Sequence, residues 1–190
     1  LKILDISSCR FKSNPGKSIA TLIKGDVLEV LNISNIIYDV NFTISMTFDV
    51  YTPIIIDALK NNRNLHKLYI ERNIDAEYME DFLKAIRTMK SLNTLDISGN
   101  AIDEYGYLIR DILLDDNLIY LDITHIGFSL ISKDDILEGL INNVNLINIK
   151  VNSYAADDNF AKILREYAKH NEENYNNRYK PLITILTDIL

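Results

Sequence analysis

The residues able to do acid–base or metal chemistry are few and widely spaced in this sequence. Asp96 and Asp122 lie 26 residues apart, each between two apolar residues. Paired carboxylates are able to act as general acid and base, but catalysis needs further converging groups. A metal site likewise needs more than two oxygen ligands. Because no histidine or nucleophile is spaced to complete either set, we expect no catalytic residue, no metal and no cofactor.

The remaining reactive residues are isolated. Three histidines share no ligand spacing: His66, His125 and His170. Cys9 is the one cysteine, so a disulfide framework is excluded and a reducing compartment is favoured. The GKS triplet at Gly16 lacks the glycine that a phosphate-binding loop carries five residues earlier, where Phe11 stands instead. We interpret it as a turn that opens a short helix at residues 17–24.

Both aspartates belong to a nine-residue frame that recurs along the chain. In LNTLDISGN, which starts at Leu92, apolar residues at the fourth and sixth positions alternate with polar ones. This period of two is typical of a strand with one buried face. Copies of the frame start at Leu1, Leu28, Leu65, Leu92, Leu118 and Leu146. The steps are 27, 37, 27, 26 and 28 residues, and four of them fit the leucine-rich repeat range of about 20–29.

The ninth position of the frame is where a side-chain amide bonds the backbone as the chain leaves the strand. Asn73 and Asn100 stand there, and Cys9 takes the alternative that the repeat template allows. Ile36, Ile126 and Tyr154 depart from the pattern, so we expect their turns to be either looser or packed by side chains.

Between the frames lie patterns with helical spacing, at residues 53–63, 77–90, 104–116 and 134–143. Thr52-Pro53 and Ser132-x-x-Asp135 are expected to begin helices. A strand–helix unit cannot bury its apolar face alone, so the units must stack. We therefore predict an α/β leucine-rich repeat solenoid, a horseshoe with a parallel β-sheet on the concave side and helices on the convex side.

This pattern resembles the ribonuclease-inhibitor type of leucine-rich repeat protein, whose repeats of this length each hold a full helix. Residues 58–62, followed by Leu65 and Leu68, also resemble the helix-to-strand junction of that class, which tropomodulin-like proteins share. The resemblance covers most of the chain. It implies the horseshoe fold and a surface that binds another macromolecule, and it does not identify the partner.

The strand residues that point away from the core should line the concave side in rows about 4.8 Å apart. Tyrosines suit an interface because they supply rigid amphipathic area at low entropic cost. We predict that the partner-binding residues are Tyr69, Glu71, Asp96, Tyr120, Asp122 and Lys150.

Two segments fit the repeat poorly. Residues 34–52 are expected to form an irregular extended insertion, and residues 40–50 alternate strictly between apolar and polar. That alternation indicates either a half-buried segment packed on the core or an exposed strand that pairs with a partner or a second copy, giving a homodimer.

Asp157-Asp158 should open a helix. We expect residues 171–190 to form a C-terminal cap, with a loop at 171–180 and a terminal strand at 182–186.

The 190 residues suit a single domain of about six repeats. The chain starts inside a repeat strand and without Met, so we interpret it as a fragment of a longer protein. A net charge of −7 and a pI near 4.9 argue against nucleic-acid or anionic-membrane partners. No apolar run approaches the ~20 residues of a membrane span. We expect the protein in the cytoplasm, or delivered into a host cytoplasm.

Four functions fit these expectations. The first is a non-catalytic scaffold that binds a protein partner through the concave face. The others are a GTPase-activating regulator resembling the Ran type, an actin-binding module resembling tropomodulin, and a pathogen effector that binds a host protein. Arg10, Arg72 and Arg110 lie near strand or loop ends, but nothing in the sequence selects one of them as a GTPase contact.

Overall fold

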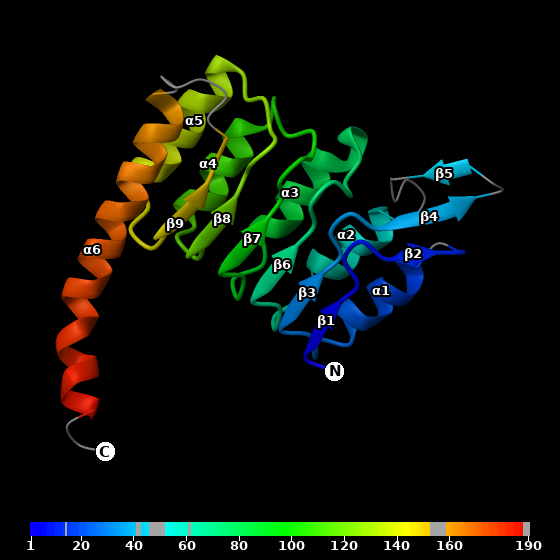
Figure 1. Cartoon of the computed structure of the whole chain (residues 1–190), viewed down its shortest axis with the longest axis horizontal. Helices are drawn as coiled ribbons and strands as arrows, with labels where there is room; N and C mark the ends of the chain where they lie inside the picture. Colours follow the sequence, from blue (N-terminus) through cyan, green and yellow to red (C-terminus); the bar gives the residue numbers. More distant parts are fainter. Residues whose placement is uncertain (14, 41–42, 46–51, 61, 153–158, 188–190) are drawn as a thin grey trace.

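The structure is a computed structural model that describes residues 1–13, 15–40, 43–45, 52–60, 62–152 and 159–187. Its centre is a six-stranded parallel sheet whose strands follow one another in chain order (Figure 1). The strands are β1 (Ile3–Asp5), β3 (Val30–Asn32), β6 (Lys67–Tyr69), β7 (Thr94–Asp96), β8 (Tyr120–Asp122) and β9 (Asn148–Lys150). Neighbours pair in the register of the nine-residue frame, so the six frame copies are stacked parallel strands, as the sequence predicts.

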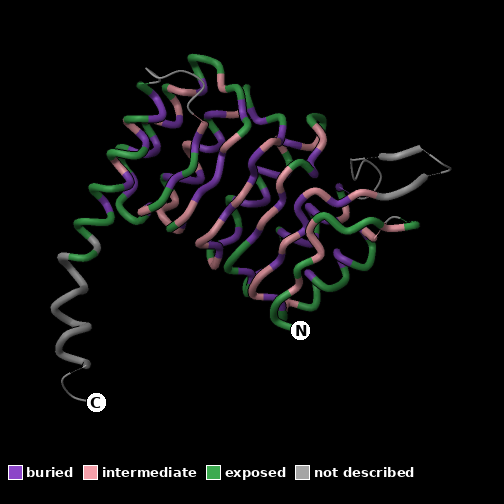
Figure 2. The backbone as a smooth tube through the Cα atoms, viewed as in Figure 1, coloured by how far each residue is buried: buried purple, intermediate pink, exposed green. Residues whose placement is uncertain are grey.

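Helices cover one face of this sheet (Figure 1). They are α1 (Gly16–Lys24), α2 (Thr52–Lys60), α3 (Met79–Arg87), α4 (Gly106–Leu114) and α5 (Leu130–Ile141), with a 3₁₀ turn η1 (Ala76–Tyr78) before α3. Among the fourth frame residues, Leu31, Leu68 and Leu95 are fully buried and belong to the core. Figure 2 shows buried residues along the central strands and along the helices beside them. The fold is therefore of the leucine-rich repeat type. Among the described residues, no helix is long and apolar enough to span a bilayer.

Five of the six strands, β1, β3, β6, β7 and β8, leave the sheet through the same left-handed turn. The eighth frame residue has a positive φ in five copies, at Ser8, Asn35, Arg72, Gly99 and His125. In two copies the ninth frame residue is an asparagine that holds the turn in place. These residues, Asn73 and Asn100, are buried, and their side chains bond backbone groups of neighbouring turns. Cys9, at the same position in the first copy, is exposed.

The segment that breaks the repeat is a second, smaller sheet. β2 (Arg10–Phe11) pairs in parallel with β4 (Ile37–Val40), and β4 pairs antiparallel with β5 (Thr43–Ser45). Because Val40 pairs with Thr43, the prediction of one extended strand along residues 40–50 was wrong. Alternation alone does not reveal where a strand reverses. Residues 41–42 and 46–50 lie outside the described residues, so homodimerisation through this segment stays a prediction.

The C-terminal part is one long helix, α6 (Asn159–Thr187), beside β9 (Figure 1). The predicted loop at residues 171–180 and the terminal strand at 182–186 were therefore wrong. Asn171 is buried, and its amide donates to the carbonyls of Asn143 (3.0 Å) and Leu146 (3.1 Å). A tertiary contact thus overrides the loop-like composition, and a helix satisfies its backbone groups without a neighbouring strand. The helix start predicted at residues 157–158 lies outside the described residues.

The helix starts show how packing shifts an expected boundary. Thr52 begins α2 as predicted, whereas α5 begins at Leu130, ahead of the predicted Ser132. Ser129 is the cap, because its Oγ accepts a hydrogen bond from Ser132 N (3.2 Å). Ser132 is buried, and its Oγ donates to the carbonyl of Asp103 (2.6 Å) in the preceding coil. Its hydroxyl therefore joins two coils.

Candidate functional site

The candidate site is the face of the six-stranded sheet that lies opposite helices α1 to α5, which we call the open face. One set of side chains runs straight across it, because strand register aligns the fifth frame residue of every copy. This set, the polar row, consists of Asp5, Asn32, Tyr69, Asp96, Asp122 and Lys150. The alignment of these residues on one face is as the sequence predicts, while their role in binding stays a prediction.

At one end of the polar row, three predicted residues contact one another. The Tyr120 hydroxyl donates to Asp122 Oδ2 (3.1 Å), and Lys150 Nζ lies 3.5 Å from the same oxygen. Lys150 Nζ also lies 5.4 Å from the centroid of the Tyr120 ring. Thr124 donates to Asp122 Oδ1 from its amide (3.1 Å) and its hydroxyl (2.8 Å). Both oxygens of this buried carboxylate therefore have partners within the protein, and the carboxylate fixes the orientation of the Tyr120 and Lys150 side chains.

Asp96 sits next to Asp122 in the row and has a different environment. Its Oδ1 accepts hydrogen bonds from Ser98 N (3.0 Å) and Ser98 Oγ (2.7 Å). Burial raises the pKa of Asp96, the Ser98 bonds lower it, and the charges of Asp122 and Glu71 raise it further. Within the described part of the chain, no cation forms an ion pair with it. A positively charged group of a partner would therefore stabilise the ionised form of Asp96.

Tyr69 and Glu71 come from the neighbouring coil. Tyr69 is half-buried in the polar row beside Asp96. Glu71, two residues on, accepts from Asn35 Nδ2 (2.8 Å) and lies 3.3 Å from Arg72 Nη1. Glu71 therefore lies just after the end of β6 and contacts Asn35 and Arg72. Neither of these two contacts involves Tyr120, Asp122 or Lys150.

The three aspartates of the polar row are hydrogen-bonded to side chains of their own turns. One carboxylate oxygen of Asp96 accepts a hydrogen bond from the Ser98 hydroxyl, and one of Asp122 accepts from the Thr124 hydroxyl. Over the residues that the structure describes, no group of three histidine, cysteine or acidic side chains is placed to hold a metal ion. The chemistry available on this face is therefore hydrogen bonding, aromatic contact and charge pairing with a partner.

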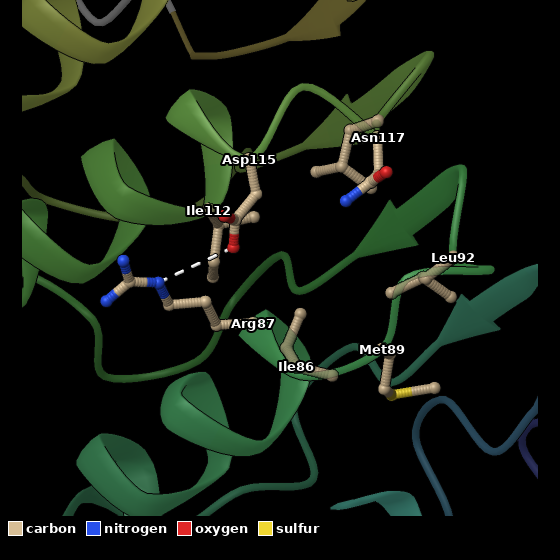
Figure 3. A pocket seen from close by; sticks show the side chains of 8 residues that line it. Ile86, Arg87, Met89, Leu92, Ile112, Asp115 and Asn117 are labelled. Carbon is tan, nitrogen blue, oxygen red and sulfur yellow. Dashed lines mark ion pairs between the residues drawn. The ribbon is translucent and has the colours of Figure 1, made fainter. Parts of the chain in front are cut away.

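The helical side holds a small seam between coils rather than a ligand site. Figure 3 shows Ile86 from α3 and Ile112 from α4 at a gap of about 10 Å³. Asp115 borders the gap, 3.4 Å from Arg87 Nε and 3.0 Å from Lys90 Nζ. Such a volume holds at most about one water molecule, so the gap is a packing seam closed by ion pairs.

A larger cavity, which the sequence did not predict, opens at the carboxyl end of the sheet. It measures about 460 Å³ and is bordered by the turns that follow β3, β6 and β7. Its lining residues come from three separate repeats, so no single motif points to it. The one signal in the sequence is Arg72, a long side chain at the turn position that Gly99 and Asn35 fill in the neighbouring coils.

Comparison with known proteins gives a likeness of fold. No protein-family model matches the chain, and no curated protein sequence matches it. The C-terminal domain of tropomodulin from Caenorhabditis elegans superposes with a TM-score of 0.69 at 16% identity, covering 87% of this chain and 98% of that domain. The domain described as leiomodin-1 actin-binding site 2 gives a TM-score of 0.67 at 14% identity, covering 90% and 96%. Identities this low establish a shared architecture and nothing about the partner.

Proposed function

We propose that this chain is a non-catalytic protein-binding module that holds its partner across the open face. The observation that carries the proposal is the Tyr120–Asp122–Lys150 cluster, which is oriented by its own contacts and lies in a row with Tyr69 and Asp96. Preorganised aromatic and charged side chains lose little entropy when a partner binds. The binding residues are the six predicted ones, namely Tyr69, Glu71, Asp96, Tyr120, Asp122 and Lys150.

The test is capture of the partner from the native source and its identification by mass spectrometry. Binding of that partner is then measured for alanine variants of the open face. Tyr69→Ala and Tyr120→Ala should each weaken binding by roughly tenfold or more, as expected for a central interface tyrosine. Tyr107→Ala is the control, because Tyr107 is an exposed tyrosine on α4, on the helical side of the sheet. Equal retention of the partner by all three variants would reject the open face as the binding surface.

An actin-binding function is the second candidate. It is favoured by the likeness to the leiomodin domain, which covers most of both chains and whose description names an actin-binding site. Co-sedimentation with actin filaments tests it directly. If the chain binds actin, it should sediment with the filaments, and the Tyr120→Ala variant should sediment less. If the chain stays in the supernatant, the actin-binding function is rejected and the general protein-binding proposal is unaffected. A GTP hydrolysis assay with small GTPases separates both from the Ran-type alternative.

We also assign the repeats to the ribonuclease-inhibitor type, with the sheet as the inner surface of a horseshoe. The support is the step of 26 to 28 residues between most frame copies and a full α-helix in each coil from β6 to β8. In this geometry the open face is concave, which suits a convex partner surface.

A further inference from the structure

The cavity at the carboxyl end of the sheet has the size of a ligand site. Its volume of about 460 Å³ lies within the range of about 300–1,000 Å³ that small-molecule pockets occupy. It lies beyond the strand ends and outside the open face, so a ligand held there would be independent of the proposed function. The lining residues are Asn35, Ile36, Ile37, Arg72, Ile74, Asp75, Ala76, Gly99, Asn100 and Ala101.

The floor of the cavity is apolar and fixed in place. Ile36 and Ile74 belong to the buried core, and Ile37 begins strand β4. Ala76 and Ala101 are exposed at the rim. Ile36 and Ile74 are only 2% and 7% exposed, so the apolar surface open to a ligand comes mainly from Ile37, Ala76 and Ala101. Covering that surface with an apolar group of a ligand would favour binding.

The amides of the lining are already used within the fold. Asn100 Oδ1 accepts from the amides of Asn73 (3.1 Å) and Ile74 (2.9 Å), and its Nδ2 donates to the carbonyls of Ile70 and Ile97. Asn35 Nδ2 donates to Glu71. Asn100 therefore has little hydrogen-bonding capacity left for a ligand, whereas Asn35 uses one donor on Glu71.

Arg72 is different, because it keeps donors free. Its Nη1 lies 3.3 Å from Glu71 Oε1, and its side chain is 54% exposed. A guanidinium has five N–H donors in a planar fork, so one pairing at this distance leaves most of them available. Asp75 also lines the cavity, and its carboxylate would repel an anion placed beside it. An anionic group is therefore favoured only at the rim where Arg72 lies.

The backbone also places Arg72 beside the cavity. Its φ of 52° is the left-handed conformation that the repeat turns share, and Arg72 occupies it where the neighbouring coils have Asn35 and Gly99. The stem of Arg72 also lies across Gly99, because a Cβ added to Gly99 would come within 2.6 Å of Arg72 Cγ. The absence of a side chain at Gly99 thus gives the Arg72 stem its path along the cavity wall.

We propose that this cavity binds an apolar group that carries a carboxylate, with the apolar part against Ile37, Ala76 and Ala101 and the carboxylate on the Arg72 guanidinium. Such chemistry is offered by a free aromatic acid and by the C-terminal residue of a peptide. Recognition by the planar fork is bidentate and requires the anion, whereas the floor alone accepts any apolar group.

The experiment is an NMR titration of the full chain with a matched pair of probes, N-acetylphenylalanine and its neutral amide. The acid should cause saturable shifts of the backbone amides of residues 72–76 and 99–101, and the amide should bind about tenfold more weakly, the worth of a charge-assisted hydrogen bond. A capped tripeptide ending in a free Phe carboxylate identifies the source, because it binds more tightly than the free acid if a peptide end is the natural ligand and no more tightly if a small acid is.

Two variants make the result decisive. Arg72→Gln should abolish the tenfold preference for the acid and leave binding of the amide unchanged. Ala101→Trp, at an exposed rim position, should block both probes by filling the cavity mouth. Arg63→Gln is the control, since Arg63 is an exposed arginine outside the cavity lining, and it should change neither affinity. The proposal is overturned if the wild type shows no saturable shifts in these turns, or if Arg72→Gln retains the preference for the acid.

Discussion

At the scale of single residues, asparagine amides hold the turns of successive coils together. Asn73 Nδ2 donates to the carbonyl of Ile33 and its Oδ1 accepts from the amide of Ile36, so this side chain bonds the turn of the preceding coil. Asn100 repeats the arrangement one coil later, with Ile70 and Ile74. An amide suits the task because it donates and accepts at once.

Replacing Asn100 with alanine should lower the free energy of unfolding by about 3 kcal/mol, because buried backbone groups of two coils lose their partners. Urea unfolding followed by circular dichroism measures the loss. Asn142→Ala is the matched control, since the Asn142 amide makes one exposed hydrogen bond, to the Glu138 carbonyl, and should cost less than about 1 kcal/mol. Similar losses in the two variants would contradict a special role for the buried amide.

The carboxylate of Asp96 should give stability a distinct pH dependence. Burial raises the pKa of Asp96 above 3.8, so the folded state holds this proton more tightly than the unfolded chain does. The contribution of Asp96 to the free energy of unfolding is therefore fully present below pH 3.8 and is lost as pH rises through the raised pKa of the folded state. Above that pKa a constant penalty remains. Asp96→Asn keeps an acceptor for Ser98 and removes the charge.

We expect Asp96→Asn to be more stable than the wild type at pH 7, with a difference that shrinks as pH falls through the raised pKa of Asp96 toward 3.8 and is absent below 3.8. Paired urea titrations across this range measure the difference between the two proteins, so effects of other carboxylates cancel. A variant that is less stable at pH 7 would show that the Ser98 hydrogen bonds need the charge and outweigh the burial.

At the scale of elements, α4 and α5 approach so closely that two glycines are required. A Cβ on Gly106 would lie 2.4 Å from the Cα of Ser132, and one on Gly139 would lie 2.8 Å from the Cα of Arg110. Backbone atoms cannot yield at these distances as a flexible side chain would. The two helices thus pack backbone to backbone at both glycines.

Gly106→Ala should therefore destabilise the fold by at least about 2 kcal/mol through overpacking, even though alanine gains about 1 kcal/mol of helix propensity. Thermal unfolding monitored by circular dichroism provides the measurement. Gly127→Ala is the control, because no atom lies within 4 Å of the added Cβ, and it should change stability by less than about 0.5 kcal/mol. A neutral Gly106→Ala would mean that the two helices separate without cost.

The elements that the sequence predicts well are those whose apolar spacing repeats from coil to coil. The strands at Leu68, Leu95 and Leu121 follow from the frame alone, because the same burial demand recurs at each copy. The sequence did not predict helix boundaries that depend on contacts between coils. The start of α5 is an example, because Ser132, the predicted start, lies inside the helix and its hydroxyl donates to the carbonyl of Asp103. The cavity was missed for the same reason, since its lining comes from three turns distant in sequence.

At the scale of the whole molecule, each coil is stabilised by its neighbours on both sides, so the end coils are held less firmly. Leu31, Leu68 and Leu95 are fully buried in the row of fourth frame residues, whereas Leu4 in β1 is only partly buried. β1 also lies at the edge of the sheet and pairs with β3 alone (Figure 1). In a stacked array, stability is approximately a sum of coil and neighbour terms, and it should therefore vary along the chain.

Native-state hydrogen exchange should reveal this gradient directly. The Ile6 amide bonds the carbonyl of Asn32 between β1 and β3, while the Ile97 amide makes the equivalent bond to Asp122 between β7 and β8. Ile6 should exchange faster because the first coil opens without breaking central contacts. Leu4→Ala should cost about 1 kcal/mol, against about 3 kcal/mol for Leu95→Ala, since a half-buried leucine loses less transfer energy and leaves a smaller cavity. Equal protection at Ile6 and Ile97, with equal costs at the two leucines, would instead require all coils to unfold as one unit, and a nearest-neighbour description of the stack would then be wrong.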